Sequence, residues 1–303
     1  MNSNLYNDYQ QIQKSHSNLC PHKIAALLQV SEAQLVHCRV GNEKVLRLSG
    51  KPADILQNLV SIGQAKGITR NNYAISIQTG EYSNPRFSHH GGLFLNPKAL
   101  DLRMFFAQWD STFALVEETS TGLRHSMQFF DKHGDALHQV YATDKTDMAE
   151  WQAIVERYAS LDNLPIVPKE ILPPSTQEIS QELAWQVPTT ALSDLLSLAY
   201  QAQNEVMLFV GNRGCVQIFT GKIKELTKNN SLNISGHNFQ LHFIENGISE
   251  CWVTRKPTKD GFVTSLEVFD KQGNQLIQMY GQRIEGTPEQ IEWSKQILSI
   301  SRL

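Results

Sequence analysis

Apolar and polar residues alternate along short stretches in the second half of the chain. In residues 238–243, Phe239, Leu241 and Phe243 would share one face of a strand, and Gln240 and His242 the other. Further stretches rich in β-branched and aromatic residues lie at 205–211, 215–220, 251–255, 262–269 and 276–282. The segments "KDG" and "KQGN" between them are typical of hairpin turns. This pattern predicts an antiparallel meander.

Spacing or capping residues predict helices at three other places. Leu192, Leu195, Leu196 and Ala199 recur at helical spacing. Near the N-terminus, residues 31–40 open with Ser31 as N-cap and Gln34 three residues later, a capping box. The end of the chain predicts a last helix over about 288–299, with Thr287 as its N-cap and a proline at its first position.

The chain carries one dodecapeptide twice. "FDKHGDALHQVY" (130–141) and "FDKQGNQLIQMY" (269–280) agree at seven of twelve positions, 139 residues apart. Segments 75–80 and 101–106 match 216–221 and 240–245 at nearly the same offset. This period is too long for a solenoid repeat and indicates a duplicated domain.

The repeat sets the expected architecture. We predict an α+β fold in which each half is a large antiparallel β-sheet with flanking helices. The first repeat, with extra N-terminal helices, covers residues 1–160. A proline-rich connector covers 161–184, and the second repeat covers 185–303.

Composition narrows the class of protein. The chain has 303 residues, 41% of them apolar, and a formal net charge of −3 without a Lys/Arg block, so neither nucleic acid nor membrane insertion is expected. The stretch 23–40 has the shape of a helix-turn-helix but too few donors for phosphates and bases. No secretory signal is expected at the polar N-terminus. The four scattered cysteines predict free thiols in the cytoplasm.

Several long segments resemble one known family. The segments are "GITRNNYAISIQTGEY", "HHGGLFLNPKALDLRMFFAQW", "MLFVGNRGCVQIFTG" and "SECWVTRKPTKDGFVTSLEVFD". Together they resemble the HemS/ChuS/PhuS family of bacterial cytosolic heme-utilisation proteins, the hemin-degrading factors. The resemblance implies heme (hemin) binding and handling for iron acquisition and iron transport, with heme as the cofactor or cargo. A heme transporter or a heme oxygenase would be the protein partner.

Family members are described as heme-degrading enzymes, as heme carriers, or as both. Three hypotheses therefore stay open for this chain. It degrades heme in the manner of a heme oxygenase, it is a non-catalytic heme carrier or store, or it is a truncated relative that has lost heme chemistry. The sequence identifies no catalytic residue.

The resemblance also implies a binding site. Heme carboxylates need cationic or hydroxyl donors. By resemblance, Lys256, Gln278, Tyr280 and Arg283 would lie near the propionates, and Arg103 would reach the distal face of heme from the first half.

The same residues also have ordinary structural interpretations. Lys256 and Arg283 would be solvated surface charges, and Gln278 and Tyr280 half-buried strand residues. Arg103 on a strand would pair with a carboxylate, either Asp101 or Glu118.

The family's axial iron ligand is a histidine on a helix between the two halves, and this chain lacks the segment that carries it. Roughly thirty to forty residues of the family pattern are missing. After His138 the next histidine is His237. Other candidate metal ligands are His242, which occupies the position of Arg103 in the repeat, and the loop pair His89 and His90.

The remaining cysteine and histidine candidates for the iron have simpler interpretations. Cys20 in "CPH" could ligate heme, although Pro21 more simply begins a helix. The remaining histidines of the first half, His125, His133 and His138, are expected on the surface.

Overall fold

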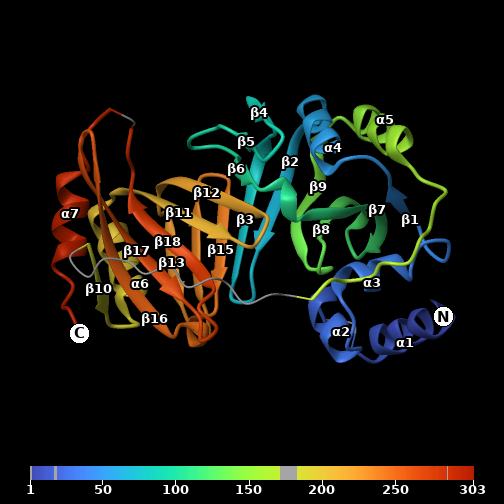
Figure 1. Ribbon diagram of the computed structural model, residues 1–303, viewed down its shortest axis with the longest axis horizontal. Coiled ribbons are helices and arrows are strands. Elements are labelled where there is room, and N and C mark those ends of the chain that lie inside the picture. The colour runs from blue at the N-terminus through green and yellow to red at the C-terminus, as the bar shows by residue number, and fades with distance from the viewer. Residues whose placement is uncertain (1, 17–18, 171–182, 285) are drawn as a thin grey trace. The chain divides into compact units, whose positions relative to one another are not determined.

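The computed structural model describes residues 2–16, 19–170, 183–284 and 286–303. Its strands form two nine-stranded antiparallel sheets with flanking helices, which confirms the predicted fold class (Figure 1). The chain divides into two compact units, within Met1–Gly67, Glu81–Gly92 and Met104–Pro173, and within Ile68–Gly80, Leu93–Arg103 and Pro174–Leu303. None of the described helices is long and apolar enough to cross a membrane.

The first unit carries the strands in the order β1-β7-β8-β9-β2. Its strands are β1 (Val45–Leu48), β2 (Gly63–Arg70), β4 (Pro85–Phe87), β7 (Trp109–Thr119), β8 (Gly122–Asp131) and β9 (Ala136–Thr146). Its helices are α1 (Asn2–Ser15), α2 (Pro21–Leu27), α3 (Glu32–His37), α4 (Pro52–Asn58) and α5 (Met148–Tyr158).

The second unit contains two runs of strands, β10-β16-β17-β18-β11-β12-β6 and β3-β15-β14-β13. The first run consists of β6 (Asp101–Met104), β10 (Ala184–Val187), β11 (Glu205–Gly211), β12 (Cys215–Lys222), β16 (Glu250–Thr258), β17 (Gly261–Phe269) and β18 (Gln275–Gly281). The second consists of β3 (Ala74–Glu81), β13 (Glu225–Lys228), β14 (Leu232–Gly236) and β15 (Phe239–Phe243), and β5 is Gly92–Phe94. The helices are α6 (Ala191–Ala202) and α7 (Ile291–Leu298).

One face of the β16-β17-β18-β11 sheet builds the core of the second unit. Because side chains alternate along a strand, Leu266 on β17 and Met279 on β18 share this face and are fully buried. They pack in one cluster with Leu196 of α6 and Trp293 of α7. The predicted strands, both hairpin turns and the helix α6 are all confirmed.

The duplication is visible in the strand register. In the first unit Leu115, Ser126 and Tyr141 lie side by side on β7, β8 and β9. In the second unit the residues 139 positions later lie side by side in the same way; they are Thr254, Ser265 and Tyr280 on β16, β17 and β18. The two three-stranded frameworks are therefore equivalent strand for strand.

Strands β3, β5 and β6 of the first half of the sequence lie mostly in the second unit. Strand β3 pairs with β15, with Leu241 opposite Ser76, and β6 lies next to β12. In the repeat, β3 corresponds to β12 and β6 to β15, so each half contributes one strand to each of these pairs. The predicted boundaries of the repeats, 1–160 and 185–303, refer to the duplicated sequence and not to these units, and they stay a prediction.

Two local predictions are wrong. The last helix begins at Ile291 with Gln290 as its N-cap, because the Thr287 hydroxyl donates to the Ile284 carbonyl (2.6 Å) instead of capping a helix. His138 is not on the surface but 1% exposed, with its Nε2 2.7 Å from the Tyr82 hydroxyl. It occupies the core-facing position that Ile277 has in the second repeat.

Candidate functional site

A cavity of about 570 Å³ lies on the second unit, on the sheet face opposite the core. Its lining residues come from β11, the β16–β17 hairpin, and β18 with the segment after it. They are Met207, Phe209, Thr258, Lys259, Asp260, Val263, Tyr280, Gly281, Arg283 and Glu289. The volume lies within the range of about 300–1,000 Å³ that is usual for small-molecule sites.

Strand alternation explains why this face carries the cavity. Tyr280 lies between Met207 on β11 and Ser265 on β17. Gln278, two residues earlier, shares its face, whereas Met279 points into the core. The Tyr280 hydroxyl donates to Gln278 Oε1 at 3.5 Å, and its ring centroid lies 5.0 Å from that of Phe209. Burial raises the pKa of Tyr280, so the phenol stays protonated and can donate.

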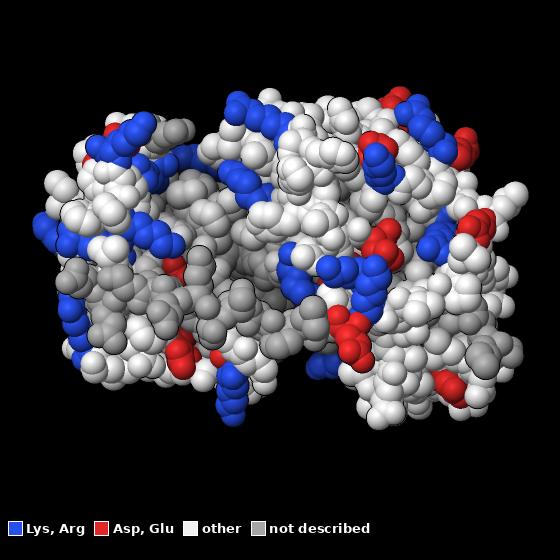
Figure 2. Space-filling view, viewed as in Figure 1, with Lys and Arg blue, Asp and Glu red and all other residues white. Residues whose placement is uncertain are grey.

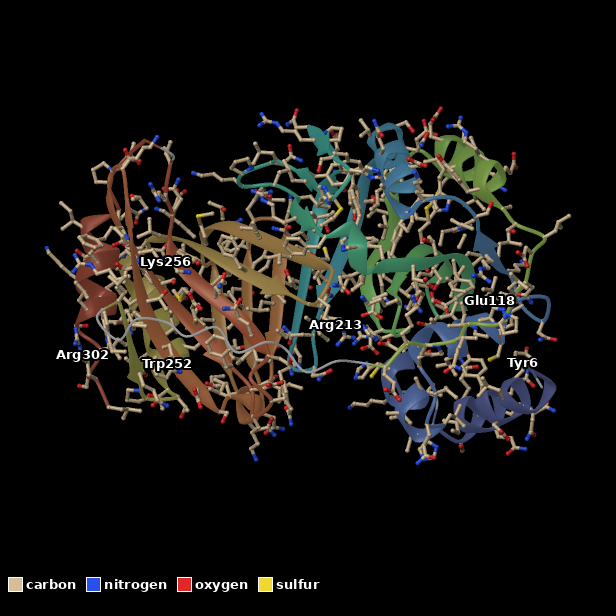
Figure 3. All side chains as sticks on the ribbon, in the orientation of Figure 1. Tyr6, Glu118, Arg213, Trp252, Lys256 and Arg302 are labelled. Carbon is tan, nitrogen blue, oxygen red and sulfur yellow. The ribbon has the colours of Figure 1, made fainter. Side chains whose placement is uncertain are left out.

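Arg283 and Lys256 bring positive charge to this end of the sheet. Arg283 Nη2 lies 3.2 Å from Asp260 Oδ2, and the buried Arg283 Nε has no hydrogen-bond partner among the described residues. Lys256 on β16 has a 64% exposed side chain, and its Nζ lies 3.5 Å from Glu267 Oε1. Figure 2 shows basic side chains gathered at the end of the second unit that carries the β16–β17 hairpin, and Figure 3 labels Lys256 and Trp252 on β16.

The structure brings four of the predicted binding residues onto one sheet. Gln278 and Tyr280 share the cavity face, Arg283 lines the cavity, and Lys256 lies two strands from β18 on the same face. The residue-based interpretation of Lys256 and Arg283 as solvated charges is incomplete, because each is paired with a carboxylate.

Arg103 pairs with Asp101, one of the two carboxylates expected from its position on a strand. On β6 of the second unit, Arg103 Nη1 donates to the Asp101 carboxylate. Burial nevertheless raises the pKa of Asp101 to about 6, although the neighbouring guanidinium opposes this shift. Arg103 is thus held by a carboxylate whose charge changes near neutral pH.

The candidate iron ligands have different surroundings. His242 Nδ1 lies 2.7 Å from Asn233 Oδ1, so one ring nitrogen is already engaged. His89 and His90 are exposed in the loop that follows β4 in the first unit, with ring centroids 6.1 Å apart. Cys20 precedes α2, with Pro21 at the first helical position as predicted. In the described part of the chain, no group of three His, Cys, Asp or Glu side chains could hold a metal.

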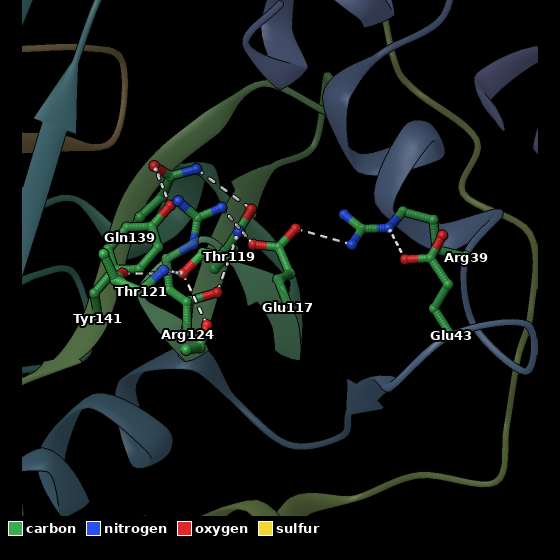
Figure 4. Close-up of polar contacts among 11 residues, drawn as sticks. Arg39, Glu43, Glu117, Thr119, Thr121, Arg124, Gln139 and Tyr141 are labelled. Atoms are coloured by element: carbon green, nitrogen blue, oxygen red, sulfur yellow. Dashed lines mark hydrogen bonds and ion pairs between the residues drawn. The ribbon is translucent and has the colours of Figure 1, made fainter. Parts of the chain in front are cut away.

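The equivalent face of the first unit repeats part of this arrangement. Tyr141 donates to Gln139 Oε1 at 3.4 Å, as Tyr280 does to Gln278 in the second unit (Figure 4). The guanidinium of Arg124 lies 5.5 Å from the centre of the Tyr141 ring. The duplication has therefore kept the Tyr–Gln pair in both units.

The two faces differ in what covers them. In the first unit Phe113 and Leu115 pack in one buried cluster with Ala33 and Val36 of the α3 region. Glu117 lies in a network of ion pairs that links it to Arg39 at 2.9 Å and Arg124 at 2.8 Å (Figure 4). The α3 region thus covers the face that is equivalent to the cavity face of the second unit.

Charge is also reversed between the copies. The residues 139 positions after Glu117 and Arg124 are Lys256 and Val263. The second unit therefore has a cation where the first has an anion, and an apolar residue where the first has a cation. Only the second pattern combines an open apolar surface with positive charge at its rim.

Sequence reasoning missed two carboxylates that hold the predicted cations. Asp260 lies in the hairpin turn, and Glu267 shares a face with Ser265 on β17. Strand alternation could have placed Glu267 on the same side as Gln278, its partner in the register. No local signal connects Asp260 with Arg283, 23 residues later.

These features define a class of protein, namely duplicated antiparallel-sheet proteins in which the second copy carries an open cavity with apolar and charged lining residues. The chain belongs to the HemS family, whose model, the haemin-degrading HemS.ChuX domain, matches residues 29–158 and 175–299. The predicted family is thereby confirmed.

Known proteins are similar over nearly the whole chain. Hemin transport protein HmuS of Yersinia pestis is 44% identical, covering 98% of this chain and 97% of that protein. The structure of the heme degrading enzyme ChuS of Escherichia coli O157:H7 is 40% identical, with a TM-score of 0.93 and 99% of both chains covered. Holo-PhuS, a heme-binding protein of Pseudomonas aeruginosa, is 30% identical, with a TM-score of 0.93 and full coverage of both chains.

The alignment with HmuS also bears on the missing segment. It extends over 336 residues, whereas this chain has 303, so at least 33 aligned positions have no residue here. The absence of the ligand-carrying segment stays a prediction.

Proposed function

We propose that this protein binds heme on the cavity face of the second unit and handles it for iron acquisition. The observation that carries the proposal is the cavity with Met207, Phe209 and Arg283 in its lining, and with Lys256 beside the lining residue Val263 on the same sheet face. Arg283 and Lys256 would pair with the heme carboxylates, and Tyr280 would donate a hydrogen bond to them. The names of the relatives HmuS, ChuS and PhuS support heme as the ligand.

The side chains of the cavity fit such a ligand. Met207, Phe209 and Val263 offer apolar surface for a macrocycle, and a flat apolar ligand gains most of its affinity from that contact. The Arg283 guanidinium can present two parallel donors to a carboxylate, and its buried Nε has no hydrogen-bond partner among the described residues. Gln278 would act through Tyr280, whose hydroxyl it orients.

Substitution of the two cations tests the site. In the Arg283→Ala/Lys256→Ala double variant, hemin affinity should fall about tenfold or more, because each partly desolvated charge-assisted contact contributes about 1.5–3 kcal/mol. Affinity is measured by titration of the Soret absorbance. Lys271→Ala, which removes an exposed cation in the β17–β18 turn, is the matched control and should bind as the wild type does. Unchanged affinity in the double variant would place the site elsewhere.

Heme degradation and heme carriage are both consistent with this site. ChuS is described as a heme degrading enzyme and PhuS as a heme-binding protein, and both share this fold. Addition of ascorbate to the hemin complex separates the two activities. Loss of the Soret band with release of a linear tetrapyrrole indicates degradation, and a stable band indicates a carrier or store. Absence of any Soret shift in the wild type would leave a relative without heme chemistry.

The partner and the location follow from the same proposal. A heme carrier would receive its ligand from a heme transporter or deliver it to a heme oxygenase, and the four free cysteines fit the reducing cytoplasm. As iron ligands, His242, His89 and His90 stay hypotheses. Arg103 would take part only when Asp101 releases it.

A further inference from the structure

A buried carboxylate lies on the proposed binding face. The side chain of Glu267 is only 7% exposed, and its position on β17 is opposite Gln278 on β18. A buried carboxylate is unexpected on a face that takes an anionic ligand, because it repels the carboxylates of that ligand.

Neutral donors fix Glu267 in place. Thr254 Oγ1 donates to Glu267 Oε1 at 2.9 Å, and Ser265 Oγ donates to the same oxygen at 3.4 Å. Gln275 Nε2 donates to Oε2 at 3.1 Å. With both oxygens held, the carboxylate cannot turn away when a ligand arrives. Lys256 is its cationic partner among the described residues, with a flexible and largely exposed side chain whose Nζ lies 3.5 Å from Oε1.

The first repeat shows that the framework does not require this charge. The equivalent residue is Gln128, which contacts Ser126 and Gln139 through hydrogen bonds of 3.3 Å. Ser126 and Gln139 correspond to Ser265 and Gln278, whereas the other two donors to Glu267, Thr254 and Gln275, correspond to Leu115 and Ala136. An amide thus serves the same position with two of the same polar neighbours. The carboxylate occurs only in the copy whose face carries Lys256.

We propose that Glu267 is an internal counter-ion that competes with the carboxylates of the ligand for Lys256 and thereby speeds ligand release. This inference rests on the proposed function and adds a mechanism by which the site releases its ligand. In the ligand-free protein, Glu267 draws the ammonium along the sheet face. On binding, Lys256 changes partner to a ligand carboxylate, and Glu267 is left with its neutral donors. On release, the ammonium returns to Glu267, so the bound state is less favoured than it would be with a neutral residue there.

The Glu267→Gln variant tests the competition, because it keeps the hydrogen bonds that Gln128 makes in the first repeat. We expect hemin affinity to rise about three- to tenfold, mainly through slower dissociation, since a like charge is removed and Lys256 is freed. Dissociation is followed by stopped flow with apomyoglobin as heme acceptor. Metal-free protoporphyrin, which has the same two carboxylates, should show the same gain in affinity. That result would exclude iron ligation as the cause of the gain.

Two further variants make the test specific. In a Lys256→Met background, Glu267→Gln should give a clearly smaller gain, because the residue for which the carboxylate competes is gone. Glu250→Gln, which removes an exposed carboxylate from β16, should leave affinity and dissociation unchanged. The thermal unfolding midpoint of each variant shows whether its fold is kept.

The possible outcomes distinguish a failure of the proposed competition from a failure of the proposed binding site. Weaker or unchanged binding in Glu267→Gln, while Lys256→Met weakens binding, would overturn the competition and leave the proposed site intact. A gain of the same size in both backgrounds would also overturn it, because Glu267 would then act without Lys256. Unchanged binding in Lys256→Met would remove Lys256 from the site and overturn the inference together with that part of the proposed function.

Discussion

At the scale of single residues, the structure pairs every predicted cation of the site with a carboxylate. Arg283 contacts Asp260, Lys256 contacts Glu267, and Arg103 contacts Asp101. A cation that already has a partner binds a ligand by exchange, so the net gain is smaller than that of an unpaired charge in the same cavity. The acidic partners of these cations therefore lower the affinity that the site can reach.

Asp101 gives a prediction about stability. Its pKa is raised to about 6 by burial, above the value of about 4 in an unfolded chain. Between these pH values the folded state binds more protons than the unfolded state, so the free energy of unfolding falls as pH rises from about 4 to 6. The loss from this one group is about 2–3 kcal/mol.

The Asp101→Asn variant should lack this part of the pH dependence. Guanidinium unfolding at pH 4, 5, 6 and 7 measures the slope, and Asp110→Asn, at an exposed position on β7, is the control. If the Asp101→Asn slope between pH 4 and 6 matched that of the wild type, the pKa of Asp101 in the folded state would not be raised.

At the scale of elements, the short helix α3 is the part of the first unit that closes its sheet face. Six residues form a weak helix by themselves, so capping and packing must stabilise it. The predicted capping box is present: Ser31 Oγ accepts from the Gln34 N–H at 3.2 Å, and Gln34 Oε1 accepts from the Ser31 N–H at 2.9 Å. Gly134, at φ +85°, comes so close that a Cβ there would lie 2.3 Å from Ser31 Oγ.

Removal of this cap should destabilise the protein. We expect Ser31→Ala to lower the free energy of unfolding by about 1 kcal/mol, because it leaves an N–H of the first turn without its acceptor. Ser15→Ala, at the exposed end of α1, should change stability much less. Chemical denaturation followed by circular dichroism measures both variants. Equal stability of Ser31→Ala and the wild type would show that packing alone holds α3.

At the scale of the whole molecule, the four cysteines differ in accessibility. Cys38, Cys215 and Cys251 are buried, and burial raises their pKa to about 11, 12 and 12. Cys20 is partly exposed. Because the thiolate is the reactive form, the three buried thiols should be inert in the folded protein.

Thiol titration with dithionitrobenzoate checks this expectation. One thiol per chain should react rapidly in the native protein, and four should react in denaturant. Cys20→Ser should abolish the rapid phase and leave three thiols in denaturant. Rapid reaction of a second native thiol would mean that one of the buried cysteines becomes exposed by local opening.

The sequence by itself determined the duplication, the strands and the faces of the strands. Alternation along 239–243 and the spacing of Leu192, Leu195, Leu196 and Ala199 are local properties, since each depends on the geometry of one strand or helix. The shared face of Gln278 and Tyr280 followed from the same rule and is found in the structure. The family resemblance selected the cations of the site, which periodicity could not have separated from ordinary surface charges.

Tertiary structure alone decided which segments meet. Strand β3 pairs with β15 from the other half of the sequence, and alternation says nothing about the partner of a strand. His138 looked like a surface histidine because its type is polar, whereas its register position made it part of the core. The pairing of Arg283 with Asp260 and of Lys256 with Glu267 likewise depends on hairpin register and side-chain reach. Such contacts join residues on different strands or turns, and only the folded chain fixes the distances between them.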